Sequence, residues 1–150
     1  MDPKITQCDP FAVLGIVTRV RRGSESPELF AGICREFESC REQIESLAIG
    51  KHYFGVNFPT DREDVSDYLA GMMVAEDAPT PEGLEKRIVV GGRFAVFECP
   101  VEAIGETYRQ VFTVWLPGAE VQFDPAVPVF EEYPECVSVQ PVCIYVPVRC

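Results

Sequence analysis

The 150-residue sequence has one histidine, one tryptophan and no pair of cysteines in a Cys-x-x-Cys pattern. A zinc site is not predicted, because ligand spacing is absent and only His52 can supply an imidazole. His52 is also the only candidate base for Cys–His or Ser–His–Asp catalysis, and the surrounding GKHYFG resembles no nucleophile motif. We therefore expect neither a metal nor a cofactor.

Long apolar runs are also missing. No stretch approaches the roughly 20 apolar residues of a membrane helix. The N-terminal MDPKITQCDP has no basic segment followed by an apolar one, so no signal peptide is predicted. We expect a cytoplasmic protein without a membrane partner, whose seven cysteines are reduced thiols that mostly fill the core.

Basic residues are few: Lys and Arg number 13 against 24 Asp and Glu, which gives a formal charge of −11. Such a surface repels phosphates, so direct binding to nucleic acid is not expected. It attracts cations over a Debye length of roughly 8–10 Å. The charge favours a cationic ligand only weakly, because acidity also keeps proteins in solution.

The first half of the chain predicts a strand, a helix and two further strands. The strand covers 11–20, which is apolar and β-branched. Ser26 and Pro27 predict the start of an amphipathic helix that stops at Gly50. Residues 51–58 and 67–75 read as strands, and the Pro-, Glu- and Gly-rich 76–87 reads as a connector.

The second half repeats this order. Residues 88–99 are strand-like, and Pro100 opens a helix in which Ile104, Tyr108, Val111, Phe112 and Trp115 recur at helical spacing. Pro117 and Gly118 stop this helix, and residues 119–135 are extended. The prolines at 141 and 147 predict that the last strand, 137–148, is an edge or bulged strand.

The repeated order indicates an internal duplication within one domain, residues 1–150, with pseudo-repeats at about 8–76 and 84–150. The predicted fold class is α+β: duplicated strand–helix–strand–strand halves related by a pseudo-two-fold axis form antiparallel sheets backed by two helices. A groove where the halves meet is a common place for a ligand pocket.

Five motifs in the second half resemble, in order, those of the GyrI-like effector-binding domains, which serve as ligand-binding halves of AraC-type and multidrug-sensing activators. The matching stretches are Tyr68-Leu69-Ala70-Gly71, Gly92-Arg93-Phe94-Ala95-Val96-Phe97, Trp115-Leu116-Pro117, Pro128-Val129-Phe130-Glu131-Glu132-Tyr133 and Ile144-Tyr145-Val146-Pro147-Val148. The first half agrees in element order, with Tyr53-Phe54-Gly55-Val56 as its best motif. The family's usual proline before the Gly-x-Tyr strand is replaced by Val89-Val90-Gly91, and no helix-turn-helix segment is expected, so the chain is read as a stand-alone member.

The resemblance implies an aromatic groove with a central glutamate, Glu131. A carboxylate among aromatic rings suits a flat organic cation, and burial without a partner raises its pKa. Glu132 should point the opposite way in an extended strand and, like Glu135, form a solvated rim. The expected ligand-binding residues are Glu131, Trp115, Tyr68, Tyr145, Phe130, Tyr133, Tyr53, Phe54 and Met72; plain core packing, or a structural role for Glu131, is the alternative.

Three functions follow from these residues. The first is a binding domain for small lipophilic, cationic, aromatic compounds. The second, implied by the resemblance, is a hydrolase of electrophilic cyclopropane-type natural products with Glu131 as general base. The third is a gyrase-inhibitor-like protein that binds a protein partner such as gyrase, although the acidic residues form no run that would mimic DNA.

Overall fold

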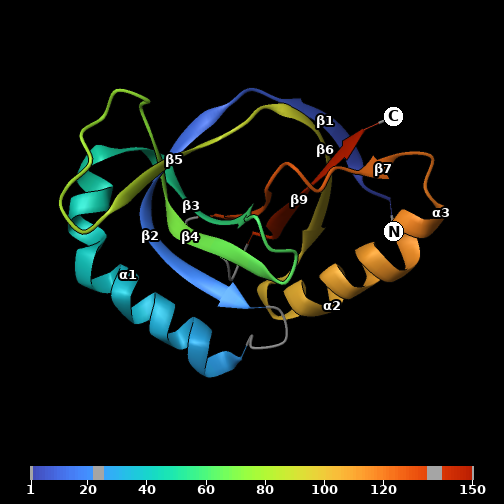
Figure 1. Ribbon diagram of the computed structural model, residues 1–150, viewed down its shortest axis with the longest axis horizontal. Helices are drawn as coiled ribbons and strands as arrows, with labels where there is room; N and C mark the ends of the chain where they lie inside the picture. Colours follow the sequence, from blue (N-terminus) through green and yellow to red (C-terminus); the bar gives the residue numbers. More distant parts are fainter. Residues whose placement is uncertain (1, 22–25, 135–139, 150) are drawn as a thin grey trace.

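A curled antiparallel sheet forms the centre of the molecule, and two helical segments lie against its outer face (Figure 1). The computed structural model describes residues 2–21, 26–134 and 140–149. The predicted α+β class, with an antiparallel sheet backed by two helices, is confirmed. Within the described residues, no helix is both long and apolar enough to cross a membrane.

The elements alternate along the chain in two similar runs. The first run comprises β1 (Lys4–Cys8), β2 (Phe11–Arg21), α1 (Pro27–Leu47), β3 (Ala48–Pro59) and β4 (Val65–Val74). The second comprises β5 (Glu85–Val89), β6 (Gly92–Cys99), a helical segment, β7 (Gln122–Phe123), β8 (Val129–Tyr133) and β9 (Val142–Arg149). The helical segment consists of η1 (Val101–Ala103), α2 (Ile104–Gln110), the π-helical η2 (Val111–Trp115) and α3 (Leu116–Gly118).

Both helical segments begin where the sequence predicts. Ser26 caps α1: its hydroxyl accepts the N–H of Leu29 at 3.1 Å, and Pro27 opens the first turn. The predicted stop at Gly50 is wrong by three residues. The helix ends at Leu47, and Gly50 lies within β3 at φ 88°, a conformation that favours glycine.

The strand order of the sheet is β1-β6-β9-β8-β3-β4-β2-β5, with β7 paired to β9. The order β6-β9-β8 of the second half mirrors β2-β4-β3 of the first, so β3 and β8 meet at the middle. The two halves also exchange their leading strands, because β1 pairs with β6 and β5 pairs with β2. This arrangement has the predicted pseudo-two-fold order, while the repeat bounds 8–76 and 84–150 stay a prediction.

The exchange brings the connectors β1–β2 and β5–β6 against each other. A Cβ atom on Gly91 would lie 2.7 Å from the carbonyl oxygen of Cys8 and 2.8 Å from Cδ of Pro10. Real side chains do not tolerate such distances to backbone atoms, so glycine is required at this crossing.

Three strand predictions need correction. The connector 76–87 ends earlier than expected, because β5 begins at Glu85 and pairs with β2. The predicted strand 88–99 is divided between β5 and β6, which are separated by Val90 and Gly91. The strand β1 was not predicted, since its short polar sequence carries little alternation. The last strand is not an edge strand, because β9 lies between β6 and β8. Pro147 lies beyond Tyr145, the last residue of β9 that pairs with β8. Residues 137–139 lie outside the described residues.

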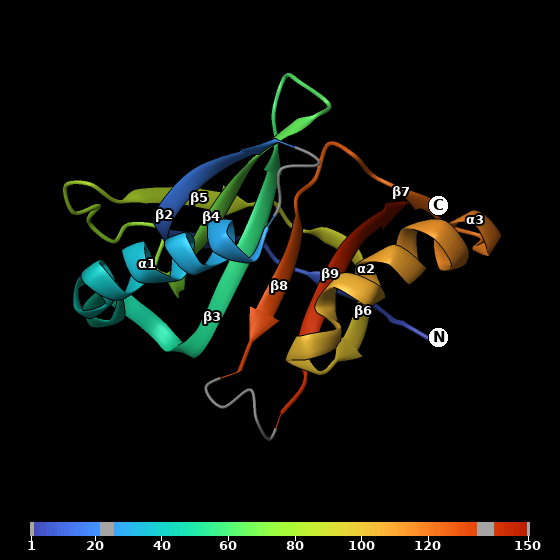
Figure 2. The same ribbon diagram turned by 90° about the horizontal axis from the view of Figure 1, so that it is seen from below.

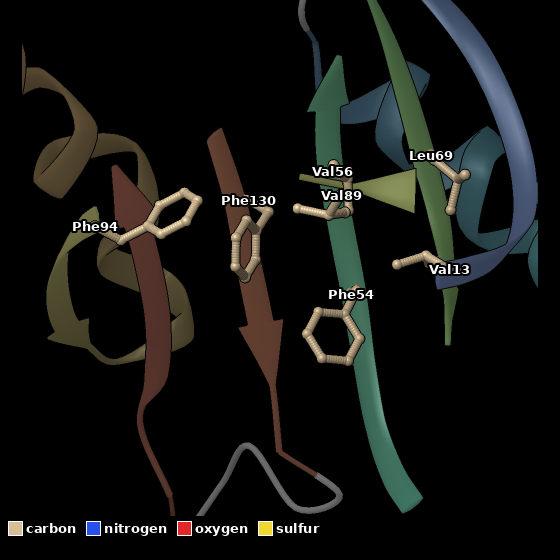
Figure 3. Close-up of a cluster of buried hydrophobic side chains, with 7 residues drawn as sticks. All are labelled: Val13, Phe54, Val56, Leu69, Val89, Phe94 and Phe130. Carbon is tan, nitrogen blue, oxygen red and sulfur yellow. The ribbon is translucent and has the colours of Figure 1, made fainter. Parts of the chain in front are cut away.

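Apolar side chains fill the interior of the curled sheet. Phe130 stacks on Tyr145 with ring centroids 4.4 Å apart, and it also contacts the rings of Phe94 and Phe54. Figure 3 shows this cluster, which is composed of Val13, Phe54, Val56, Leu69, Val89, Phe94 and Phe130. A second cluster lies between the second helical segment and the strands β6 and β9.

The cysteines contribute less to the core than expected. The five that the structure describes, Cys8, Cys34, Cys40, Cys99 and Cys143, are free thiols, and of these only Cys99 is buried. The expectation that most thiols fill the core is therefore wrong for this part of the chain.

Candidate ligand-binding site

A cavity of about 1840 Å³ opens between the two helical segments, over the central strands of the sheet. Figure 2 shows β3 and β8 running between α1 and α2. The volume exceeds the roughly 300–1,000 Å³ of an ordinary small-molecule pocket, so a bulky ligand has room here. The cavity lies at the predicted place, where the two halves of the sheet meet.

Strand alternation decides which side chains form the floor. Tyr53, Gly55 and Asn57 share one face of β3, and Glu131 and Tyr133 share the matching face of β8. In the β3–β8 register, Gly55 lies opposite Glu131 and Tyr53 lies opposite Tyr133. Because Gly55 has no side chain, the hydroxyl of Tyr68 can occupy the space over it, 2.1 Å from where a Cβ atom would lie.

Glu131 is buried, with 5% of its surface exposed, and all its hydrogen-bond partners in the described chain are neutral. The hydroxyl of Tyr108 donates to Oε2 at 2.6 Å, and Nδ2 of Asn57 donates to the same oxygen at 3.3 Å. The hydroxyl of Tyr133 donates to Oε1 at 3.2 Å. No salt bridge among residues 2–21, 26–134 and 140–149 involves this carboxylate.

The environment changes the protonation of Glu131. Burial raises its pKa from 4.5 to about 7, and the hydrogen bonds from Tyr108 and Tyr133 offset only part of this effect. A pKa of about 7 makes both the protonated and the ionised form of this side chain accessible near neutral pH. A positive charge brought into the cavity would favour the ionised form.

Tyr68 extends the network from the neighbouring strand β4. Its hydroxyl hydrogen-bonds to Tyr133, which in turn donates to Glu131. Burial, together with the nearby Glu131 charge, raises the pKa of Tyr68 well above its usual value, so this phenol stays protonated. The network therefore surrounds one carboxylate with neutral hydroxyl groups.

Aromatic pairs form the walls. From α1, the ring of Phe37 packs edge-on against Tyr53 at 5.7 Å, and the ring of Phe30 packs edge-on against Tyr68 at 5.9 Å. From the second helical segment, Tyr108 stacks with Phe112 at 6.5 Å. Phe30 and Phe112 remain partly exposed although they are large and apolar, so the cavity mouth is apolar as well.

The basic side chains on the cavity wall are paired with acids other than Glu131. Arg41 bonds to Glu38 and Glu45, and its guanidinium also contacts the hydroxyl of Tyr53 and lies 5.3 Å from the centre of that ring. Arg62 pairs with Asp64, and Arg109 pairs with Glu106. The charge of Glu131 is thus not offset by the wall.

Five of the nine predicted binding residues border the cavity: Glu131, Tyr68, Tyr133, Tyr53 and Phe54, although the ring of Phe54 packs in the interior cluster. The other four lie elsewhere. Phe130 and Tyr145 stack in the sheet interior, since their positions alternate away from the cavity. Trp115 packs edge-on against Phe97 at 5.2 Å in the second apolar cluster, and Met72 is buried in β4.

Two polar residues of the site were missed by the sequence reasoning. Tyr108 was read only as part of the apolar stripe of its helix, and Asn57 was not singled out. A signal for Asn57 exists in retrospect, because it follows Tyr53 and Gly55 at a period of two on one face of β3. No comparable sequence pattern indicates Tyr108. Its hydroxyl reaches Glu131 only because α2 packs over β8.

Glu132 faces away from the cavity, as its alternation with Glu131 predicts. It is not simply a solvated rim charge: Nδ1 of His52 lies 2.6 Å from its Oε2, and the hydroxyl of Tyr145 donates to its Oε1 at 2.8 Å. Glu135 lies outside the described residues.

An antiparallel half-barrel with a ligand cavity between two helices is the architecture of the GyrI-like effector-binding domains. The chain matches the Cass2 family, described as integron-associated effector binding proteins, over residues 4–148. Because the match spans nearly the whole chain, the protein belongs to this family. Among curated proteins, none matches it in sequence.

Solved structures share this fold at low sequence identity. SAV2435 bound to tetraphenylphosphonium superposes with a TM-score of 0.79 at 15% identity, covering 99% of this chain and 94% of that chain. An integron cassette protein from the mobile metagenome of Vibrio cholerae has a TM-score of 0.69 at 20% identity, with coverage of 99% and 96%. The C-terminal domain of EcmrR has a TM-score of 0.65 at 11% identity, with coverage of 99% and 97%.

Proposed function

We propose that this effector-binding protein takes up small lipophilic organic cations in the cavity between α1 and α2. One observation carries the proposal: Glu131 is a buried carboxylate whose hydrogen-bond partners among the described residues are neutral, in a cavity walled by aromatic rings. An unpaired buried charge is costly, and a cationic ligand removes that cost while it gains apolar and cation–π contacts.

The charge of the cavity supports a cation over a neutral or anionic ligand. Arg41, Arg62 and Arg109 are each matched by a nearby acid other than Glu131, so within the described residues Glu131 is a buried charge without an opposite partner. This carboxylate would repel an anionic ligand. A structural relative of the same fold, SAV2435, is described as bound to tetraphenylphosphonium, which is a lipophilic aromatic cation.

A thermal-shift experiment tests the proposal. The probes are methyltriphenylphosphonium and triphenylphosphine oxide, which carry the same three rings with and without a net charge. We expect the cation to raise the melting temperature of the wild type and to lose most of this effect in Glu131→Gln, whereas the neutral compound should act alike on both. Equal stabilisation by the two probes would show that charge is not recognised.

The hydrolase is the second candidate, because a carboxylate with a pKa of about 7 beside the Tyr108 hydroxyl can accept a proton near neutral pH. Turnover of an electrophilic cyclopropane substrate, lost in Glu131→Gln, would support it. Stoichiometric binding without product would exclude it for that substrate. The gyrase-inhibitor hypothesis gains no support from the cavity, and its test is a supercoiling assay at micromolar protein.

A further inference from the structure

The Glu131 carboxylate has little capacity left for hydrogen bonds from a ligand. A carboxylate offers about four lone-pair sites. Tyr108 and Asn57 occupy Oε2, at 2.6 Å and 3.3 Å, and Tyr133 occupies Oε1 at 3.2 Å. Three of the four sites are therefore taken by neutral donors of the protein itself.

Burial adds to this restriction. With 5% of Glu131 exposed, a ligand in the cavity meets the hydroxyl groups and rings of the tyrosines rather than the carboxylate oxygens. The Coulomb attraction of the carboxylate still acts across this shell, because it needs no directed donor and buried surroundings screen a charge less than bulk water does. The Glu131 carboxylate therefore attracts a cationic ligand without contacting it directly.

The tyrosine oxygens are poor substitutes as acceptors. The oxygen of Tyr133 already accepts the hydroxyl of Tyr68, and the oxygen of Tyr53 accepts the guanidinium of Arg41. An ammonium N–H that leaves water must replace its water acceptors, and few unoccupied acceptor sites remain among these buried phenols. An ammonium N–H that leaves water for this cavity therefore loses more than it regains.

We infer that the cavity selects permanently charged, weakly hydrated cations without N–H groups, such as quaternary ammonium, pyridinium-type or aryl phosphonium compounds, over protonated amines of the same shape. This inference rests on the proposed function and narrows its ligand class. Tyr108 is the residue that enforces the selection, since its hydroxyl makes the shortest contact that covers the carboxylate.

The test compares two probes, (2-naphthylmethyl)trimethylammonium and protonated (2-naphthylmethyl)dimethylamine, by calorimetric titration at pH 7.5. The wild type should bind the quaternary probe at least tenfold more tightly. The additional methyl group accounts for about fourfold of this ratio through apolar transfer alone. The decisive quantity is therefore the change of the ratio between variants, in which the methyl contribution cancels.

Tyr108→Phe uncovers one lone pair of Oε2 and should lower the ratio at least fivefold, mainly by tighter binding of the amine. Tyr145→Phe is the matched control, because its hydroxyl lies outside the cavity and donates to Glu132, on the opposite face of β8, instead of Glu131. Its ratio should equal that of the wild type.

The possible failures are distinguishable. If neither probe binds the wild type, or if Glu131→Gln binds both as well as the wild type does, the proposed function itself is wrong and this inference falls with it. If both probes bind through Glu131 but the amine binds as tightly as the quaternary cation, the proposed function stands and only the selection is refuted. An equal ratio in Tyr108→Phe and Tyr145→Phe also refutes it.

Discussion

The hydroxyl of Tyr68 occupies the space that a side chain on Gly55 would fill. A Cβ atom added to Gly55 would lie 2.1 Å from this hydroxyl oxygen and 2.8 Å from Cζ of the same ring. The two residues belong to neighbouring strands, and Gly55 also faces Glu131 across the β3–β8 register. The absence of one side chain thus allows a tyrosine of β4 to reach the network around a glutamate of β8.

Replacing Gly55 by alanine should therefore disturb the site more than the addition of a single methyl group suggests. The buried Tyr68 ring must move, which should lower the free energy of unfolding by roughly 1–3 kcal/mol and weaken cation binding. Urea denaturation and titration with methyltriphenylphosphonium measure the two effects. Gly118→Ala is the control, since nothing lies within 4 Å of an added Cβ there, and its behaviour should match the wild type. Unchanged affinity in Gly55→Ala would mean that Tyr68 does not help to form the site.

The stability of the empty protein should depend on the ionisation of Glu131. Its pKa is raised from 4.5 to about 7, so the folded state binds the proton more tightly than the unfolded state does. The favourable contribution is present at low pH and is lost as the pH rises towards the folded-state pKa. Relative to Glu131→Gln, the free energy of unfolding of the wild type should fall by roughly 3 kcal/mol between pH 4.5 and pH 8.

Denaturation of both proteins across this pH range measures the difference. Tyr133→Phe offers an internal check, because its lost hydrogen bond normally lowers the pKa of Glu131. In that variant the folded-state pKa should be higher, so the fall should extend to higher pH and be larger. A constant difference between wild type and Glu131→Gln would indicate that the carboxylate does not titrate in this range.

Binding of a permanently charged cation should become stronger as the pH rises. If the cation binds the ionised carboxylate, the apparent affinity scales with the ionised fraction, and a pKa of about 7 leaves little of this form at pH 5.5. The dissociation constant of methyltriphenylphosphonium should then be roughly thirtyfold higher at pH 5.5 than at pH 8.5. The probe itself does not titrate, so a flat profile would contradict a role for ionised Glu131.

Arg41 should weaken the binding of cations. Its guanidinium already lies over the ring of Tyr53 at 5.3 Å, where a ligand cation would gain its own cation–π contact. Arg41→Gln should therefore increase cation affinity by a few-fold and leave triphenylphosphine oxide unaffected. Arg62→Gln removes an equal charge from the wall without freeing a ring, and it should have a smaller effect. Weaker cation binding in Arg41→Gln would show that Arg41 supports the ligand rather than competing with it.

Trp115 should matter for stability and not for the ligand. Its ring packs against Phe97 beneath the second helical segment, away from the residues that line the cavity. Trp115→Phe should lower the free energy of unfolding by about 1–2 kcal/mol and keep the affinity for methyltriphenylphosphonium within twofold of the wild type. A loss of affinity without a loss of stability would show that Trp115 contributes to the binding site.

Much of the fold can be predicted from short-range features of the sequence. The cap of Ser26 and Pro27 places α1, and an apolar, β-branched run places β2. The proline and glycine that follow Trp115 end the second helical segment. Alternation within Phe130-Glu131-Glu132-Tyr133 also assigns Glu131 and Glu132 to opposite faces of β8. These features depend on neighbours in sequence, which is why a pattern is sufficient to predict them.

Other features depend on residues that are far apart in the chain. The short strand β1 forms because β6 offers it a partner, and β9 becomes an inner strand because β8 folds back beside it. The same holds in the site. Tyr108, Asn57 and Tyr133 reach one carboxylate from three elements, and the space above Gly55 is filled by Tyr68 from a fourth. Sequence alternation predicts that Glu131 is the acid that faces the cavity. Only the packing of α2 and β4 against β3 and β8 gives this carboxylate neutral hydrogen-bond partners and, among the described residues, no cationic one.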